Sequence, residues 1–447
     1  MIKNEVLKYK EEYLRDLFEI LKIDSVLKEQ PDCPDAPFGK GCKEALLKTL
    51  ELGKKMGFKV KNIDNVSGHI EFGEGKEILG ILAHLDVVPT GEGWTTPPFE
   101  PNIRDGKLYA RGSNDDKGPL MSALYAMKIL KDKGFVPNKR VRLIVGTDEE
   151  TGSRGVRRYL QCEEMPTMGF SPDAEFPLIY GEKGIMSIDI VSKEHSDEID
   201  SILSGDRYNV VPEKCIAKLN VNLEKEFNEY LEKLNTKAKG YAKGFELCAL
   251  GQRAHAMEPR NGDNALLKMF NFLSKHLDNN LIKFASKYLN DSRFNDLGLA
   301  YTHKEMKDLT CNVALCNIDA NGGKIGLNLR YPIGWDKEHF FKVLNEKAGE
   351  FSLEVKMLGD GEPLYVSPDC DLIKKLHQAY TDCTGDFESP LLTIGGGTYA
   401  RMLKNAVAFG AGFPGREEVA HNVDEYMDVS DLLKAIEIYM RAIELLA

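Results

Sequence analysis

The stretch that decides the fold is EILGILAHLDVV, residues 77–88, an almost unbroken apolar run with His84 and Asp86 near its end. Its length and lack of polar alternation are typical of a strand buried on both faces of a parallel or mixed sheet. KGPLMSALYAMKILKDKG (117–134) predicts a helix, with a proline in its first turn and a glycine at its end. RVRLIVGTDEE (140–150) predicts a second buried strand that runs into a polar loop. A strand, a helix and a strand at this spacing indicate an α/β fold.

The pattern changes twice along the chain, which predicts one domain inserted into another. Helical spacing of apolar residues precedes the first strand, and alternating strand-like segments with more polar helices fill 185–365. The first pattern returns near 372, and a last helix is predicted from an N-cap at Ser430 to the end of the chain. We expect an α/β domain with a mixed, mostly parallel sheet flanked by helices, formed by 1–182 and 370–447, and a large inserted α+β domain formed by 183–369.

Composition excludes several classes of partner. The 447 residues include 70 acidic and 59 basic side chains, for a net charge of −11, without a long basic run. Neither nucleic acid nor an anionic membrane surface is therefore an expected partner. The nine cysteines are scattered without a C-x-x-C pair, which argues against a disulfide framework and fits a reducing compartment. With no signal-peptide core and no apolar run longer than a strand, we expect a cytoplasmic protein without a membrane span.

His84 and Asp86 are the first residues that indicate chemistry. At positions i and i+2 of a strand their side chains face the same side. They lie at the carboxyl end of the predicted strand, where open α/β sheets place ligands. A single histidine there is usually structural, but a metal-bound histidine normally donates its second N–H to a carboxylate or carbonyl, and Asp86 is available for that role.

Further acidic side chains follow at the ends of other predicted elements. Asp115 and its neighbour Asp116 precede a helix, where an acidic pair also has a simple capping explanation. The acids at 148–150 follow a buried strand; a solvated turn would explain them, yet three adjacent acids repel one another and call for a cation or a raised pKa. Asp173 lies in a proline-flanked loop, and His421 precedes the last helix.

Taken together, these side chains suit divalent metal ions. Two histidines and three carboxylates offer nitrogen and oxygen ligands of the kind that Zn²⁺, Mn²⁺ or Co²⁺ accepts. Two such ions bring four positive charges, which Asp115, Glu150, Asp173 and one bridging hydroxide would neutralise. The sequence therefore predicts a buried site that can hold two metal ions.

The motifs resemble those of the co-catalytic zinc peptidase family that includes carboxypeptidase G, aminoacylases, succinyl-diaminopimelate desuccinylase, tripeptidase T and carnosinases. The resemblance covers the chain nearly end to end and is strongest to the bacterial dipeptidases of the family. The motifs that carry it occur in the family's order: AHLDVVPTGEGW, YARGSNDDKGP, VGTDEETGS, GFSPDAEFP, GEKG, IGGGTYAR and the late His421.

The resemblance implies a set of ligands for each of two metal ions, and it assigns roles to the neighbouring acids. Asp115 would bridge the ions, with His84 and Asp173 completing one site and Glu150 and His421 the other. Asp86 would orient His84. Glu149 would be the general base that takes a proton from the water shared by the ions and passes it to the leaving amine.

The resemblance also assigns the inserted domain as a lid that contacts the substrate. His255 would donate a hydrogen bond to the oxyanion, and Asn209 would contact the substrate near the scissile bond. Arg330 would hold the terminal carboxylate, for which a guanidinium fork is suited. Gly397 would offer backbone N–H groups to the same end of the substrate. A single histidine, asparagine or arginine in a domain of this size is usually structural, and only the matching local motifs favour a contact with substrate.

These features predict a metal-dependent dipeptidase, acting as a monomer, that cleaves dipeptides with a free amino terminus. Asp at 173 is the pattern of family members that act on free amino termini, and a clamp on the terminal carboxylate would limit substrate length. Two alternatives stay open: an N-acyl amino acid amidohydrolase or desuccinylase of the same superfamily, and a non-hydrolytic metal-binding protein. A nucleotide or redox enzyme is disfavoured, because the glycines at 395–397 lack the spacing of a phosphate-binding loop.

Overall fold

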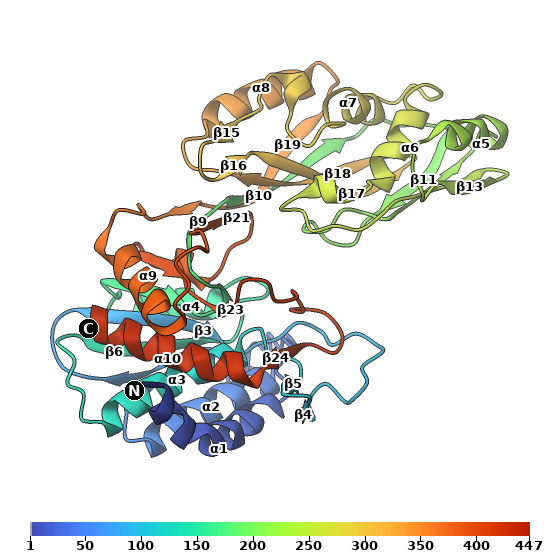
Figure 1. The fold of residues 1–447 in the computed structure, drawn as a ribbon. Helices are drawn as coiled ribbons and strands as arrows, with labels where there is room; N and C mark the ends of the chain where they lie inside the picture. Colours follow the sequence, from blue (N-terminus) through green and yellow to red (C-terminus); the bar gives the residue numbers. More distant parts are fainter. Residues whose placement is uncertain (1) are drawn as a thin grey trace. The chain divides into compact units, whose positions relative to one another are not determined.

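The computed structural model describes residues 2–447, and the chain divides into two compact units (Figure 1). Unit 1 consists of residues 1–181, 365–392 and 398–447, and unit 2 of residues 182–364 and 393–397. The short segment 393–397 departs from the sequence-based boundaries, which placed everything after 370 in the first domain. Its backbone is hydrogen-bonded within unit 2: Lys183 N–H donates to the Ile394 carbonyl at 3.0 Å, and Arg330 Nη1 donates to the Gly395 carbonyl at 2.8 Å.

Unit 1 is built on a nine-stranded mixed sheet. Pairing is parallel in the centre, between β6, β3, β7 and β22, and antiparallel where β1, β2 and β9 join it. The α/β class with a mixed sheet is thereby confirmed, with the parallel part confined to the centre. In sheet order the strands are β1 (Lys59–Ile63), β2 (Ser67–Phe72), β6 (Arg140–Gly146), β3 (Ile78–His84), β7 (Met168–Ser171), β22 (Ala406–Ala408), β9 (Ile179–Glu182) and β20 (Leu364–Tyr365), with β21 (Leu392–Ile394) paired to β9.

The apolar run that decided the fold forms β3, and all seven of its residues are buried. Helices cover both faces of the sheet, as two adjacent residues of β2 show. Ile70 lies against Gly53 of α2, whereas the His69 ring, which points to the opposite face, contacts the hydroxyl of Tyr159 in α4 at 2.7 Å. The helices of unit 1 are α1 (Ile2–Leu21), α2 (Lys40–Lys55), α3 (Lys117–Asp132), α4 (Arg154–Cys162), α9 (Asp371–Thr384) and α10 (Val429–Leu446), with a 3₁₀ turn η3 (Tyr399–Met402).

Two short sheets shape the loops of unit 1. The first pairs β24 with β5 and β5 with β4, and the second pairs β23 with β8. The first sheet leads straight into α10, because Asp428 pairs with Lys107 and the next N–H donates to the Gly106 carbonyl at 2.9 Å. The predicted N-cap at Ser430 is therefore wrong: Asp428 is at the N-cap. The strands are β4 (Asn102–Arg104), β5 (Lys107–Tyr109), β24 (Tyr426–Asp428), β8 (Ala174–Glu175) and β23 (Ala411–Gly412).

Unit 2 contains an eight-stranded antiparallel sheet with four helices along it (Figure 1). One apolar core joins the sheet to these helices, as expected for an α+β unit. The strands, in sheet order, are β13 (Gly240–Lys243), β14 (Glu246–Leu250), β12 (Lys214–Leu219), β11 (Ile199–Ser204), β17 (Thr310–Asp319), β18 (Gly322–Tyr331), β10 (Gly184–Ser192) and β19 (Glu354–Gly361). The remaining elements are β15 (Thr302–His303), β16 (Lys307–Asp308), α5 (Glu224–Lys233), α6 (Ala265–Leu273), α7 (Asn280–Tyr288), α8 (Lys337–Gly349) and the 3₁₀ turns η1 (Pro259–Asn261) and η2 (Asn295–Leu297).

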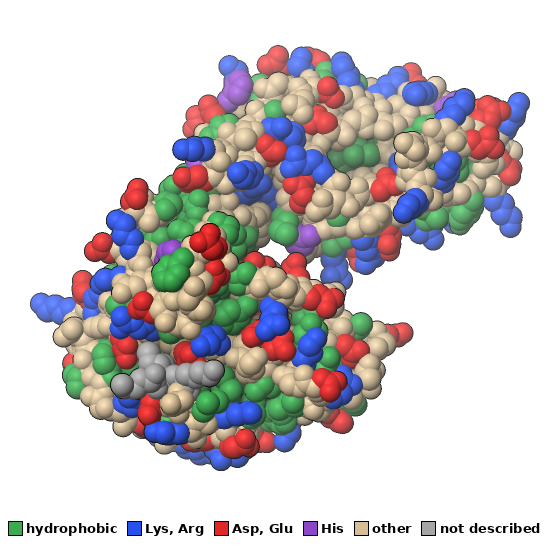
Figure 2. Space-filling model, in the orientation of Figure 1, with side chains coloured by type: hydrophobic (Ala, Val, Ile, Leu, Met, Phe, Trp, Pro, Cys, Tyr) green, Lys and Arg blue, Asp and Glu red, His purple; other side chains and the backbone are tan. Residues whose placement is uncertain are grey.

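The surface and the cysteines add two general observations. Figure 2 shows basic and acidic side chains interspersed on the face that it presents, without a large area of one sign. Within residues 2–447, no helix is both long and apolar enough to cross a bilayer. All nine cysteines are free, and four of them are buried in the core of unit 2 or in its sheet.

Candidate metal centre

Three neighbouring strands of the unit 1 sheet deliver the predicted site residues to one edge. The strands β6, β3 and β7 are adjacent and parallel, so their carboxyl ends lie side by side. His84 is the last residue of β3, Glu149 and Glu150 follow β6, and Asp173 follows β7. This is the edge at which open α/β sheets bind ligands.

Asp115 lies between the two predicted histidine ligands. Its Oδ1 is 2.9 Å from Nε2 of His84, and its Oδ2 is 2.9 Å from Nε2 of His421. The same His84 nitrogen is 3.7 Å from Asp173 Oδ2, and the same His421 nitrogen is 3.1 Å from Glu150 Oε1. One carboxylate thus faces two groups of ligands, one through each oxygen.

These separations fit shared metal ions. Two atoms bound to one zinc ion at about 2.0–2.2 Å lie about 3.4 Å apart when the angle at the ion is tetrahedral. The four nitrogen–oxygen distances around Asp115 fall on either side of that value. Ligand atoms of His84, Glu149 and Asp173, and likewise of His84, Asp115 and Glu150, also lie within 4.8 Å of one another. The donor set and its spacing therefore suit divalent cations.

The carboxylates around the two histidines raise the pKa of both rings. Burial alone would lower the pKa of His421, but its hydrogen bonds to Asp115 and Glu150 raise that pKa to about 11. Burial likewise opposes protonation of His84, yet hydrogen bonds to Asp115 and Asp173 raise its pKa well above the usual value. A divalent ion would displace these protons and take over their role of neutralising the carboxylates.

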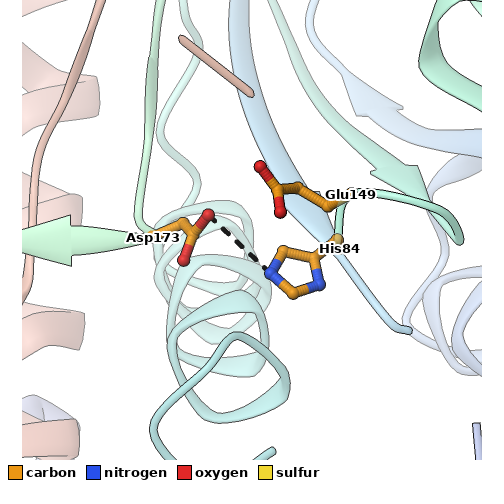
Figure 3. Close-up of side chains that lie close together, drawn as sticks. All are labelled: His84, Glu149 and Asp173. Carbon is orange, nitrogen blue, oxygen red and sulfur yellow. Dashed lines mark ion pairs between the residues drawn. The ribbon is translucent and has the colours of Figure 1, made fainter. Parts of the chain in front are cut away.

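Glu149 lies beside the ligands on the loop after β6. Figure 3 shows its carboxylate together with the side chains of His84 and Asp173, which form the ion pair drawn there. Burial raises the pKa of Glu149 well above its usual range, and the negative charge of Asp173 adds to the rise. A carboxylate with a raised pKa is a stronger base, which is the property required of a proton acceptor near neutral pH.

Asp86 is fully buried, and its backbone and side chain have different partners. Nδ1 of His84 is 2.9 Å from the backbone carbonyl of Asp86 and 3.6 Å from its carboxylate. The two carboxylate oxygens accept hydrogen bonds from the N–H groups of Glu149 and Glu150, each at 3.1 Å. The predicted orientation of His84 is thus supplied mainly by the carbonyl, while the carboxylate holds the loop that carries the base.

The three adjacent acids of that loop, for which the sequence called for a cation or a raised pKa, have different environments. Asp148 is fully buried and pairs with Arg154, whose Nε donates to it at 2.6 Å. Burial raises the pKa of both Glu149 and Glu150. One member is therefore neutralised by a guanidinium within the loop, and the other two face the centre.

Sequence reasoning missed Glu425, which lies four residues after His421. Glu425 is fully buried and accepts hydrogen bonds from the N–H groups of Gly112, Asn114 and Asp115. An acid four residues after a predicted ligand histidine is a weak local signal, because its partners are more than 300 residues away in the chain.

The four residues predicted to contact substrate all belong to unit 2. Asn209 and His255 are brought together by the backbone, since the Ala256 N–H donates to the Asn209 carbonyl at 2.9 Å. Nδ1 of His255 accepts the Met257 N–H at 3.1 Å, which places the proton of a neutral ring on Nε2. Arg330 and Gly397 are linked through the glycine-rich turn, where Arg330 donates to the Gly395 carbonyl.

Known proteins are similar to this chain in sequence. A family model described as peptidase family M20/M25/M40 matches residues 80–445. YtjP of Bacillus subtilis (strain 168), named as an inferred dipeptidase, is 42% identical over 462 residues that cover 99% of each chain. A protein of Staphylococcus aureus (strain MW2) with the same kind of name is 39% identical over 463 residues, covering 99% of this chain and 98% of that one.

Solved structures with low sequence identity share the fold. Human carnosine dipeptidase 1 is 15% identical with a TM-score of 0.61, over 99% of this chain and 98% of that chain. The YXEP protein of Bacillus subtilis, described as a dinuclear metal binding peptidase, is 12% identical with a TM-score of 0.54, over 98% of this chain and 99% of that chain.

Proposed function

The chain belongs to peptidase family M20/M25/M40, and from this premise we propose that it is a metal-dependent dipeptidase acting on dipeptides with a free amino terminus. The observation that carries the proposal is the position of Asp115, with one oxygen 2.9 Å from each histidine nitrogen. A carboxylate shared in this way is what a pair of neighbouring metal ions requires of the protein.

The proposed ligands follow from the contacts around Asp115. His84 and Asp173 would hold one ion with it, and Glu150 and His421 the other. When bound, the ions supply Lewis acidity toward the scissile carbonyl and lower the pKa of a water molecule toward neutrality. We propose zinc as the ion, with manganese and cobalt as the alternatives, because all three accept nitrogen and oxygen ligands.

Proton transfer is assigned to Glu149. Its carboxylate oxygen lies within 4.8 Å of ligand atoms of His84 and Asp173, where it would take a proton from the attacking water and return that proton to the leaving amine. Asp86 contributes by holding the Glu149 N–H and so the base itself. Glu149 is thereby proposed as the acid and base of peptide-bond hydrolysis.

Substrate contacts are assigned to unit 2. We propose that His255 Nε2–H stabilises the oxyanion, as its tautomer favours, and that Asn209 contacts the scissile region. Arg330 and Gly397 would bind the terminal carboxylate, which would favour dipeptides over longer chains. The protein is proposed to act as a monomer in the cytoplasm, where its free cysteines would stay reduced.

The test is a substrate panel with controlled metal content. The full chain is stripped with a chelator and supplied separately with Zn²⁺, Mn²⁺ or Co²⁺, and cleavage of dipeptides, tripeptides and N-acyl amino acids is followed by release of free amino acid. Metal-restored cleavage of dipeptides alone supports the proposal and names the ion. Cleavage of N-acyl amino acids without dipeptides would replace it with the amidohydrolase alternative, and binding of ions without hydrolysis of any substrate would replace it with a non-hydrolytic role.

A further inference from the structure

Glu425 is a buried carboxylate next to the metal centre that the proposed chemistry does not use. None of its side chain is exposed. Its oxygens accept hydrogen bonds from the N–H groups of Gly112 at 3.1 Å, Asn114 at 2.8 Å and Asp115 at 3.1 Å, and from Arg111 Nη1 at 2.7 Å. One side chain therefore holds the backbone of the loop that ends in the proposed bridging ligand.

The three-stranded sheet of β24, β5 and β4 in unit 1 brings Glu425 to this loop. Strand β24 pairs with β5 so that Tyr426 lies opposite Tyr109, and the Ala110 N–H donates to the Glu425 carbonyl at 3.2 Å. The residue before β24 is thereby set beside the residues that follow β5. Because the pairing registers two segments more than 300 residues apart, the position of Glu425 relative to Asp115 is determined by the sheet.

Arg111, the partner of Glu425, contacts the backbone of the other segment. It is 1% exposed, and its Nη2 is 3.4 Å from the backbone carbonyl of His421. Each of the two segments thus contains one proposed ligand and one member of the buried ion pair. Glu425 holds the backbone of Asp115, and Arg111 contacts the backbone of His421.

The backbone around His421 adds a second, independent observation. His421 and Asp424 both have positive φ, 65° and 55°, a left-handed conformation that few residues other than glycine adopt, histidine and aspartate more often than most. Residues in such conformations persist when the surrounding structure holds them. The Asp424 carboxylate accepts bonds from the N–H and hydroxyl of Thr95 at 2.9 and 2.7 Å, and Glu425 follows directly with its own contacts.

We propose that Glu425 and Arg111 are positioning residues that hold Asp115 and His421 at the separation at which both can bind one metal ion. This inference rests on the proposed function, because it takes Asp115 and His421 as ligands. A buried ion pair by itself is weak support for stability, because desolvation of both charges offsets their attraction. Because this pair contacts the backbones of two proposed ligands directly, we assign it the positioning of those ligands and not the stabilisation of the fold.

Unit 1 offers a matched control in the pair of Glu71 and Arg142. Glu71 is 6% exposed and Arg142 3% exposed, and Arg142 Nε donates to Glu71 at 2.6 Å. The two residues face each other across β2 and β6, and no hydrogen bond to a proposed ligand is recorded for either of them among the described residues. Substituting Glu71 therefore removes a buried carboxylate from an arginine without touching the metal centre.

The test compares metal affinity in Glu425→Gln and Glu71→Gln. The amide of Glu425→Gln offers one acceptor oxygen, and its NH₂ group would face N–H donors. Affinity of the metal-stripped full chain for Zn²⁺ or Co²⁺ is measured by competition with a chelating dye, with folding checked by circular dichroism. We expect Glu425→Gln to weaken metal binding about 10- to 100-fold, the usual range for groups that orient ligands, and Glu71→Gln to leave it unchanged.

The outcomes separate the inference from the proposed function. Glu425→Gln that folds and binds metal as tightly as the wild type overturns the inference, as does an equal loss in Glu71→Gln. If Glu425→Gln does not fold, Glu425→Asp decides: its carboxylate is one methylene short of the three N–H groups, so weaker binding supports the inference and wild-type affinity overturns it. A wild-type protein that binds the ions but cleaves no dipeptide refutes the proposed function, while the affinity comparison still decides the role of Glu425.

Discussion

Replacing Asp86 with asparagine isolates what its carboxylate does. The substitution leaves the backbone carbonyl, which lies 2.9 Å from His84 Nδ1, in place. It changes the side chain that accepts the N–H groups of Glu149 and Glu150, each at 3.1 Å. Asparagine has one acceptor oxygen and one NH₂ group, so it can accept only one of these two bonds and must turn a donor toward the other N–H.

The size of the effect follows from the bond that is lost. A hydrogen bond to a charged acceptor contributes about 1.5–3 kcal/mol, and about 1.4 kcal/mol corresponds to a tenfold change in rate. If the full loss falls on the position of Glu149 in the transition state, Asp86→Asn lowers kcat about 10- to 100-fold. The fall should persist at saturating metal, because the base loop is disturbed whether or not the ions are bound.

The assay is steady-state hydrolysis of a dipeptide over a range of metal concentrations. Glu71→Gln is the control, because Glu71 is a buried carboxylate of unit 1 that pairs with Arg142 at 2.6 Å. A kcat for Asp86→Asn equal to that of the wild type at saturating metal would refute the reasoning. If excess metal restores full activity, the carboxylate acts on metal affinity alone and its assigned hold on Glu149 is wrong.

Three further outcomes are expected. Glu149→Ala should keep both ions, measured by metal analysis, and lose at least about 100-fold in kcat, because the proton acceptor is gone; full activity would exclude the general base. His255→Ala should fold normally by circular dichroism and lower kcat more than it raises KM; a variant that unfolds would show that His255 is structural. Burial lowers the pKa of His69 to about 4 from its unfolded value of about 6.5, so the folded state resists protonation. The contribution of His69 to the free energy of unfolding should therefore fall by about 3 kcal/mol as pH drops from 6.5 to 4. In denaturant titrations His69→Gln should lose that component of the pH dependence, and an unchanged pH dependence in the variant would contradict it.

The elements of unit 1 could be predicted because their signals are local. The run at 77–88 is apolar without alternation. Its residues Ile78–His84 form a strand, and all of them are buried. The helix predicted over 117–134 is observed as Lys117–Asp132. Periodicity and terminal residues decide such elements, since they depend on neighbours within a few positions. The N-cap of the last helix could not be predicted, because a hydrogen bond to Gly106 determines where that helix begins.

The metal centre could be predicted only as far as its side chains. His84, Asp115, Glu150, Asp173 and His421 were selected from motifs, and the structure brings all five together. The different environments of the three adjacent acids at 148–150 could not be predicted from the sequence. Three acids in a row gave no indication that Asp148 pairs with Arg154 while the other two face the centre, since that depends on how the loop closes.

The sequence alone therefore determined the α/β class, the order of the motifs and the residue types of the proposed two-metal site, because strand and helix periodicity and ligand chemistry are properties of the chain itself. Tertiary structure decided which groups hold those ligands in place. The Asp86 carboxylate supports a loop 63 residues away, and Glu425 supports Asp115 across 310 residues. Hydrogen bonds and desolvation depend on which groups are neighbours in the folded chain. These distant segments become neighbours only when the strands of the sheets pair.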